Sequence, residues 1–182
     1  MGSSMLETAG IAIPLLDAFA DREWYAAYTC AQHEKSVSQQ IRAKGVEVLL
    51  PTAPVERRWK DRVVQLELPL FPGYVFVRMR LEERLKVLSV PSVVRLVSSN
   101  GKPAAVDSSE IEAIRSCLTS PSGVQSHPYV AMGSRVRVKC GVLLGVEGII
   151  VRHEAGCRLV VSIQLLHQAL AVEIDPADVE PA

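Results

Sequence analysis

The segment LFPGYVFVRM, residues 70–79, decides how the N-terminal half of this chain folds. Pro72 followed by Gly73 predicts a type II turn, because proline restricts φ and glycine readily adopts a positive φ. Such a turn holds the Cα atoms of Phe71 and Tyr74 within about 7 Å of each other. The strand that follows places Val75, Val77 and Met79 on one face and Tyr74, Phe76 and Arg78 on the other.

Both faces of this strand are apolar near the turn, whereas packed helices can cover only one face of a sheet. We therefore expect Phe71 and Tyr74 to face outward together, with Tyr25 or Tyr28 from an earlier strand beside them. An exposed apolar patch of this kind marks a partner site. The alternative is that the linker or the C-terminal region folds back and buries the rings as ordinary core. The residues alone leave both alternatives open.

The neighbouring segments predict an α+β domain. WYAAYT (24–29) alternates as a strand, residues 31–45 form a helix that Gly45 ends, and residues 46–52 form a short strand. Residues 55–68 alternate on both sides of Lys60-Asp61, which predicts a hairpin with a charged tip. A helix over 81–90, a strand over 93–97 and a helix over 107–118 with a capping box of Asp107 and Glu110 complete the set. The order β-α-β-β-β-α-β-α predicts helices packed against a mainly antiparallel sheet.

The C-terminal third predicts a second, all-β domain. Residues 119–128 are rich in Ser, Pro and Gly and read as a linker, and four β-rich runs follow at short spacing, as in a small closed barrel. The expected boundaries are 1–21 for a flexible extension, 22–119 and 129–182 for the domains, and 120–128 for the linker. IAIPLLDAFA (11–20) is too short to span a bilayer, so we expect no membrane partner.

Composition indicates an ordinary soluble protein of 182 residues, with 48% hydrophobic residues and a formal net charge of zero. Residues 24–120 hold 14 Lys and Arg against 10 Asp and Glu, whereas residues 129–182 hold 5 against 6. A polyanion would therefore meet the first domain rather than the second. The four cysteines lie far apart without a CxxC motif, which favours reduced thiols and a cytoplasmic location.

WYAAYT with its following helix, the charged hairpin and LFPGYVFV resemble the N-terminal (NGN) domain of NusG-type transcription elongation factors. GSRVRVKCGVLLGVEGIIV (133–151) resembles the KOW motif that opens their C-terminal barrel. The resemblance covers roughly residues 22–181 and implies an NGN α/β sandwich followed by an SH3-like five-stranded barrel. It also implies a non-enzymatic factor without a cofactor. Such a factor binds the RNA polymerase clamp, suppresses pausing or termination, and recruits a further protein through its barrel.

The resemblance assigns polymerase binding to the aromatic corner and its first strand. The expected residues are Trp24, Tyr25, Tyr28, Phe71, Pro72, Gly73 and Tyr74. The hairpin ERRWKDR (56–62) carries four cations and an aromatic ring, which suit phosphate contact and base stacking. Upstream or non-template DNA is its expected ligand, through Arg57, Arg58, Trp59, Lys60 and Arg62. The alternative for these residues is a solvated hairpin.

In the barrel, Gly141, Gly145 and Gly148 mark tight turns or close backbone approach, which is a structural role. Housekeeping NusG proteins carry a Phe-Gly-Arg turn near the last strands for contact with the termination factor Rho and a ribosomal protein. This chain instead reads SIQLLHQALAVEI (162–174), so Rho recruitment is in doubt. The segment looks more like specialised paralogues such as UpxY-type antiterminators. We expect an unknown protein partner at Leu165, Leu166 and His167. Residues 135–174 show no helical period, so we expect strands rather than the helical hairpin of another paralogue.

Two other groups of residues give only weak evidence for a metal site or a catalytic nucleophile. Cys140, His153 and Cys157 have loosely finger-like spacing but lack a fourth ligand, so we expect no metal. Cys30 and His33 have no orienting acid and do not predict a nucleophile. The rival function is a ribosomal or RNA-processing protein that uses its KOW barrel on RNA, and the slight negative charge of 129–182 argues against it.

Overall fold

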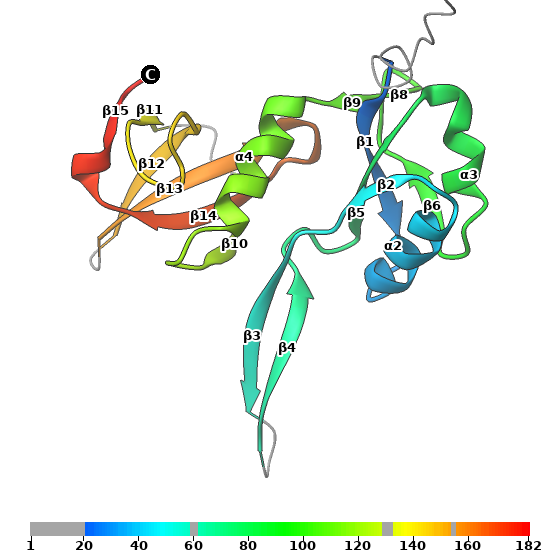
Figure 1. Cartoon of the computed structure of the whole chain (residues 1–182), viewed down its shortest axis with the longest axis horizontal. Helices are drawn as coiled ribbons and strands as arrows, with labels where there is room; N and C mark the ends of the chain where they lie inside the picture. Colours follow the sequence, from blue (N-terminus) through cyan, green and yellow to red (C-terminus); the bar gives the residue numbers. More distant parts are fainter. Residues whose placement is uncertain (1–20, 59–61, 129–132, 154–155) are drawn as a thin grey trace, which may run out of the picture.

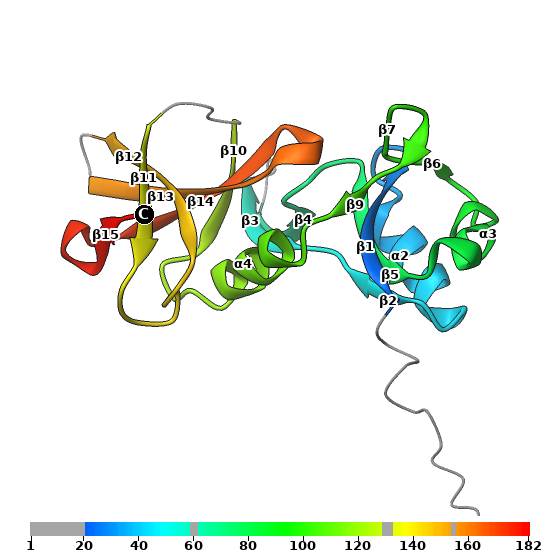
Figure 2. The ribbon, with the colours of Figure 1, turned by 90° about the horizontal axis from the view of Figure 1, so that it is seen from above.

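The computed structural model of the chain describes residues 21–58, 62–128, 133–153 and 156–182. These residues form an N-terminal and a C-terminal region, with helix α4 (Ser108–Leu118) between them in both views (Figures 1 and 2). Residues 1–20 of the expected extension and the hairpin residues Trp59 and Lys60 lie outside the described residues. Within the described part of the chain, no helix has the length and apolar character needed to cross a membrane.

The N-terminal region is built on an antiparallel sheet in the order β2-β5-β1-β6, and β9 also pairs with β1. Its strands are β1 (Glu23–Thr29), β2 (Glu47–Leu49), β5 (Tyr74–Met79), β6 (Val93–Leu96) and β9 (Ala105–Val106). Its helices are α2 (Glu34–Ala43) and α3 (Arg84–Leu88), and the 3-10 turn η1 (Leu81–Glu83) precedes α3. The predicted strands and helices are confirmed, although the predicted helix over 81–90 is shorter and divided between η1 and α3.

The two faces of this sheet meet different neighbours. Strands β1 and β5 pair so that Tyr25 lies opposite Val77 and Ala26 opposite Phe76. The Tyr25 face packs against helices α2 and α3 in a buried core whose members include Val37, Ile41, Val75, Val77, Met79 and Val87. Helices α2 and α3 thus cover one face of the sheet. The expectation that helices cover only one face is wrong, because Ile111 and Ile114 of the third predicted helix, α4, pack on the face that carries Trp24, Ala26 and Phe76.

The charged hairpin projects away from both regions (Figure 1), although Ala53 near its base is buried against them. Strands β3 (Thr52–Arg58) and β4 (Val63–Pro69) pair only with each other in the described structure, in a register that sets Val55 opposite Leu66 and Arg57 opposite Val64. A smaller hairpin, β7 (Ser98–Ser99) and β8 (Lys102–Pro103), closes over Asn100 and Gly101, which both have positive φ.

The C-terminal region is a six-stranded antiparallel sheet in the order β10-β14-β13-β12-β11-β15. Its strands are β10 (Val124–Pro128), β11 (Ser134–Val138), β12 (Glu147–His153), β13 (Gly156–Ile163), β14 (Gln168–Ile174) and β15 (Val179–Pro181), with 3-10 turns η2 (Gln164–Leu166) and η3 (Pro176–Asp178). The expected linker over 120–128 needs correction, because its last five residues form β10 and bond to β14. In VQSHP three polar residues follow Val124 without alternation, so no local pattern separated this strand from a linker.

Helix α4 has two buried sides. Ala113 and Cys117 pack into the C-terminal core with Val136, Val138 and Leu159, and the Cys117 side chain is fully buried. Ile111 and Ile114 pack with residues of the N-terminal sheet instead. At about 3.6 residues per turn, these two sets lie on adjacent sides of one helix. Helix α4 is thus a shared layer between the two regions.

Candidate functional site

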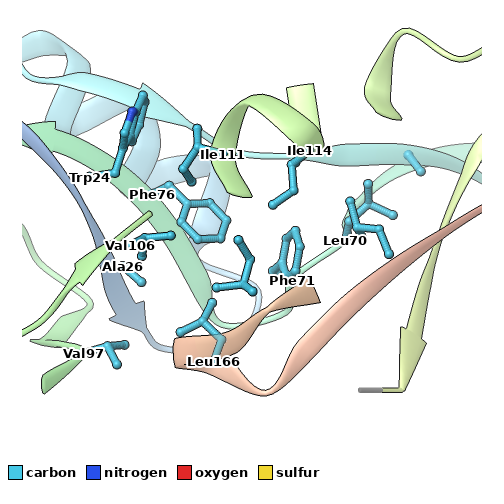
Figure 3. Close-up of a cluster of buried hydrophobic side chains, with 13 residues drawn as sticks. Trp24, Ala26, Leu70, Phe71, Phe76, Val97, Val106, Ile111, Ile114 and Leu166 are labelled. Atoms are coloured by element: carbon cyan, nitrogen blue, oxygen red, sulfur yellow. The ribbon is translucent and has the colours of Figure 1, made fainter. Parts of the chain in front are cut away.

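A cluster of buried apolar side chains joins the two regions (Figure 3). The N-terminal region contributes Trp24, Ala26, Ala53, Leu70, Phe71, Phe76, Val97 and Val106. Helix α4 contributes Ile111 and Ile114, and the C-terminal region contributes Ile163, Leu166 and Leu170. We call these residues the interdomain cluster and the arrangement that buries them the closed structure. The second face of the N-terminal sheet is therefore covered by α4 and by the η2–β14 segment.

The Phe-Pro-Gly-Tyr turn forms as predicted. The Tyr74 amide donates to the Phe71 carbonyl at 3.1 Å, and Gly73 has a φ of +81°. The orientation of the rings differs from the expectation, because Phe71 is 0% exposed and meets Phe76 edge-to-face at 5.3 Å between ring centroids. Phe71 and Tyr74 thus do not face outward together. The alternative holds, since the C-terminal region folds back over Phe71 and completes a continuous apolar core around it.

The Tyr74 ring packs at the margin of the interdomain cluster and is less covered than Phe71. It is half-buried and meets the Tyr28 ring at 5.4 Å between centroids. Tyr28 is 37% exposed, and the Arg95 guanidinium lies 5.5 Å from its ring centroid, within the range of a cation–π contact. Among the residues expected to bind polymerase, only Tyr28 and Pro72 are exposed in the closed structure.

Tyr25 and Trp24 lie on opposite faces of β1, and both are buried. Tyr25 belongs to the core under α2 and α3, and its hydroxyl donates to Glu23 at 2.8 Å. Burial, with this hydrogen bond to a carboxylate, raises the pKa of Tyr25 to about 12. The expectation that Tyr25 shares a surface with Phe71 is therefore corrected, because strand alternation turns it to the other face.

Trp24 lies at the edge of the interdomain cluster, where a charged side chain of α4 packs over its ring. The Arg115 guanidinium of α4 sits 5.1 Å from the Trp24 ring centroid and pairs with Glu47 of β2 at 3.0 Å. Arg115 also pairs with Glu112 one turn earlier. These contacts hold the later half of α4 against the N-terminal sheet. Sequence reasoning missed Arg115, because nothing local shows that a helical arginine will meet a residue 68 positions earlier in the chain.

Glu110 links α4 to the C-terminal region instead of completing a capping box. Asp107 caps the helix by accepting from the Ser109 amide at 2.7 Å, as predicted. Glu110 accepts from the backbone amide of Gln164, the first residue of η2, at 3.2 Å. Burial raises the pKa of the Glu110 carboxyl, and the negative charge of Asp107 adds to that effect, against the opposing hydrogen bond from Gln164. Glu110 therefore accepts a hydrogen bond from a distant segment of the chain, whereas the predicted capping box would have paired it with the N-terminus of its own helix.

The loop of the C-terminal region expected to bind a partner faces the N-terminal region. Leu166 is 9% exposed within the interdomain cluster, and Leu165 is half-buried against it. His167 is exposed and has a φ of +50°, which turns the chain into β14. The segment expected to bind a protein is thus largely buried by the domain that carries Phe71.

Gly141, Gly145 and Gly148 of the C-terminal region occupy positions that restrict side chains. Gly141 and Gly145 have φ values of +80° and +81° in the loop between β11 and β12. At Gly148, a Cβ would lie 2.6 Å from the Val160 carbonyl oxygen of the neighbouring strand, which leaves no room for a side chain. These geometries match a structural role.

The described hairpin cations, Arg57, Arg58 and Arg62, are all exposed. Arg57 and Arg58 are adjacent in a strand, so their side chains leave opposite faces of the hairpin. The cations therefore flank the ribbon rather than forming one flat patch.

Comparison with known proteins assigns the chain to a family. A sequence model described as transcription termination factor NusG matches residues 22–115. The transcription termination/antitermination protein NusG of Pasteurella multocida is 31% identical over 172 residues, which cover 91% of this chain and 92% of that protein. The chain belongs to the NusG family. NusG of Helicobacter pylori (strain J99) is 26% identical over 171 residues, covering 87% of this chain and 97% of that protein.

A solved structure on domain interaction in NusG of Thermotoga maritima is also similar to this chain. It has a TM-score of 0.50 and 25% identity, and the match covers 89% of this chain and 98% of that one. The NusG resemblance stated from the sequence is therefore confirmed over both regions of the chain. The specialised-paralogue resemblance and the division at residue 119 remain predictions.

The cysteines and histidines singled out in the sequence make local contacts. The exposed Cys140 thiol donates to Asp178 at 3.0 Å, and this hydrogen bond raises its pKa, which opposes thiolate formation. The His33 Nδ1 atom lies 2.6 Å from the Ser92 hydroxyl. The side chains of the described residues form no group of three or more His, Cys, Asp or Glu that could hold a metal ion.

Proposed function

We propose that this NusG-family chain is a non-enzymatic transcription elongation or antitermination factor. In this proposal its N-terminal domain binds the clamp region of RNA polymerase through the face that carries Phe71, and it suppresses pausing or termination. Membership of the NusG family supports this role, since the similar proteins are named for transcription termination and antitermination. The C-terminal KOW barrel would recruit a further protein.

The interdomain cluster carries the proposal. The N-terminal sheet has a second apolar face, and the elements that cover it beyond α4 come from the other region of the chain. If the two regions part, this face becomes a contiguous exposed apolar patch, and such patches mark partner sites. Phe71, a fully buried aromatic at the centre of this face, is the kind of residue that dominates binding energy at interfaces.

The proposed polymerase face and the proposed barrel partner site are covered by each other. Phe71 and Leu166 are buried in the same cluster, so neither site is available in the closed structure. Binding at either site therefore requires the regions to part, and the free energy of parting reduces the apparent affinity of the first partner. The second partner then finds its site already exposed, so the two partners bind cooperatively.

The barrel partner is proposed to differ from Rho. The chain lacks the Phe-Gly-Arg turn of housekeeping NusG proteins, and Leu165 and Leu166 stand in that part of the segment. An apolar loop of this kind suits a protein partner, and it fits the resemblance to operon-specific paralogues of the UpxY type. The exposed hairpin arginines are proposed to contact upstream or non-template DNA.

The test is a set of full-length variants measured for binding to RNA polymerase. Leu166→Asp is expected to tighten apparent binding by favouring the open arrangement. Adding Phe71→Ser in that background is expected to weaken binding about 100-fold, because truncating an aromatic hot spot at an interface costs roughly 3 kcal/mol. Val94→Ser is the matched control, since Val94 is 54% exposed on the same domain and lies outside the interdomain cluster. If the double variant stays folded by circular dichroism and binds as tightly as Leu166→Asp alone, polymerase does not dock on this face.

A further inference from the structure

Glu34 is an unusual residue in this fold. It is the first residue of α2, and its side chain is 4% exposed, which is rare for a glutamate. The ion pairs found among the described side chains do not include it. A buried carboxylate needs compensating donors, so its contacts define its role.

The carboxylate faces the Phe-Pro-Gly-Tyr turn. Glu34 Oε1 accepts from the Gly73 backbone amide at 2.7 Å, the length of a charge-assisted hydrogen bond. The start of α2 adds the positive end of a helix dipole beneath the carboxylate. These two features explain how an acidic side chain can stay buried at this place.

The turn needs this acceptor for a geometric reason. In a turn closed by the hydrogen bond from Tyr74 to Phe71, the amide at the third position has no partner within the turn. Pro72 has no amide hydrogen, so the Gly73 amide is the one donor of the two central residues, and Gly73 is buried. Without Glu34 that donor would lack its acceptor away from water, which is costly.

Gly73 is held from its other side as well. Its carbonyl accepts from the Thr29 amide at the end of β1 at 2.8 Å. A Cβ on Gly73 would lie 3.2 Å from the Tyr28 ring, so this ring packs closely over the glycine. Thr29 and Glu34, on either side of the junction between β1 and α2, therefore hydrogen-bond to the carbonyl and the amide of Gly73. Gly73 lies between Phe71 and Tyr74 in the turn.

We propose that Glu34 is a positioning residue for partner binding, because its carboxylate fixes the turn that presents Phe71 and Tyr74. This role rests on the proposed docking of polymerase at that turn. Glu34 itself stays buried and touches no partner. It keeps the turn in one conformation, so the aromatic side chains do not have to be ordered when the partner binds.

The test uses Glu34→Gln, Glu34→Asp and Glu34→Ala in the full-length Leu166→Asp background, where closure does not compete. Gln keeps an acceptor oxygen at the same reach, Asp keeps the charge but is one methylene shorter, and Ala removes both. We expect Gly73 amide hydrogen exchange to rise at least tenfold in the Asp and Ala variants, and polymerase affinity to fall about tenfold. The Gln variant is expected to stay within threefold of its parent in both measurements.

Ser38→Ala is the matched control, because Ser38 is also buried on α2 and, among the described residues, its hydroxyl donates to the Lys35 carbonyl of the same helix. If Ser38→Ala lowers affinity as much as Glu34→Asp, or if Glu34→Asp keeps the exchange rate and affinity of its parent, the proposal is overturned. If Glu34→Ala fails to fold, the comparison of Glu34→Asp with Glu34→Gln in the same two measurements tests the proposal. If Phe71→Ser leaves the affinity for polymerase unchanged, the docking proposal fails. Hydrogen exchange of the Gly73 amide still tests whether the Glu34 carboxylate stabilises the turn.

Discussion

Leu166→Asp is the perturbation that tests the closed structure most directly. Leu166 is 9% exposed in the interdomain cluster and is absent from the core of the C-terminal sheet, so its replacement should spare the fold of that region. Losing the burial of one leucine removes roughly 2 kcal/mol of docking free energy. Burying an aspartate among apolar side chains without a partner costs at least several kcal/mol more.

Together these terms weaken closure by at least about 4 kcal/mol, which shifts the ratio of closed to open molecules about 1,000-fold. Cys117 reports the change, since it is fully buried between α4 and the C-terminal core, and burial raises its pKa to about 12. Arg115 holds α4 to the N-terminal sheet, so parting of the regions should expose the Cys117 thiol. We expect its alkylation, followed by mass spectrometry, to accelerate strongly in Leu166→Asp.

The exposed Cys30 provides an internal reference for the reagent, and Val142→Asp provides a matched charge on an exposed residue of the same region. Small-angle X-ray scattering should show a larger radius of gyration for Leu166→Asp than for Val142→Asp. Expansion with Cys117 still protected would show that α4 leaves with the C-terminal region. If neither alkylation nor size differs from the parent, the interdomain cluster does not hold the regions together.

Three further predictions address other parts of the molecule. Replacing Arg57, Arg58 and Arg62 with Gln should make the salt dependence of binding to a transcription elongation complex shallower by a log–log slope of about 3, whereas Lys35→Gln on α2 should change it by less than about 1. Gly148→Ala should lower the free energy of unfolding in urea by roughly 2–3 kcal/mol, because its Cβ would clash with the Val160 carbonyl oxygen. Gly141→Ala should lower it by only about 1 kcal/mol, because the space around Gly141 is open and only its positive φ is unfavourable. Equal effects of the two substitutions would contradict this reasoning. Burial raises the pKa of Glu110, so its protonated form is favoured in the closed structure and closure should be strongest below the ordinary glutamate pKa. Closure should then weaken as the pH rises through the raised pKa, and Glu110→Gln should remove this dependence in scattering measurements across the same pH range.

The sequence by itself determined the local elements and the family. Alternation in β1 and β5, the Pro72-Gly73 turn and the Asp107 cap are set by short-range stereochemistry, which a sequence shows directly. It also showed that the N-terminal sheet has two apolar faces, because alternation assigns each residue to a side. The motifs on both sides of the α4 segment were enough to indicate the NusG family.

Only the tertiary structure decided what covers the second face. Whether Phe71 contacts water or Leu166 depends on the docking of segments about 95 residues apart. The hydrophobic effect is non-directional, so the residues around Phe71 in the sequence do not specify which apolar segment will cover it. The same holds for Glu34 and Glu110, whose local patterns suggest an ordinary first turn and a capping box. Each carboxylate instead accepts a distant backbone amide, at Gly73 and Gln164, and only the fold brings these groups together.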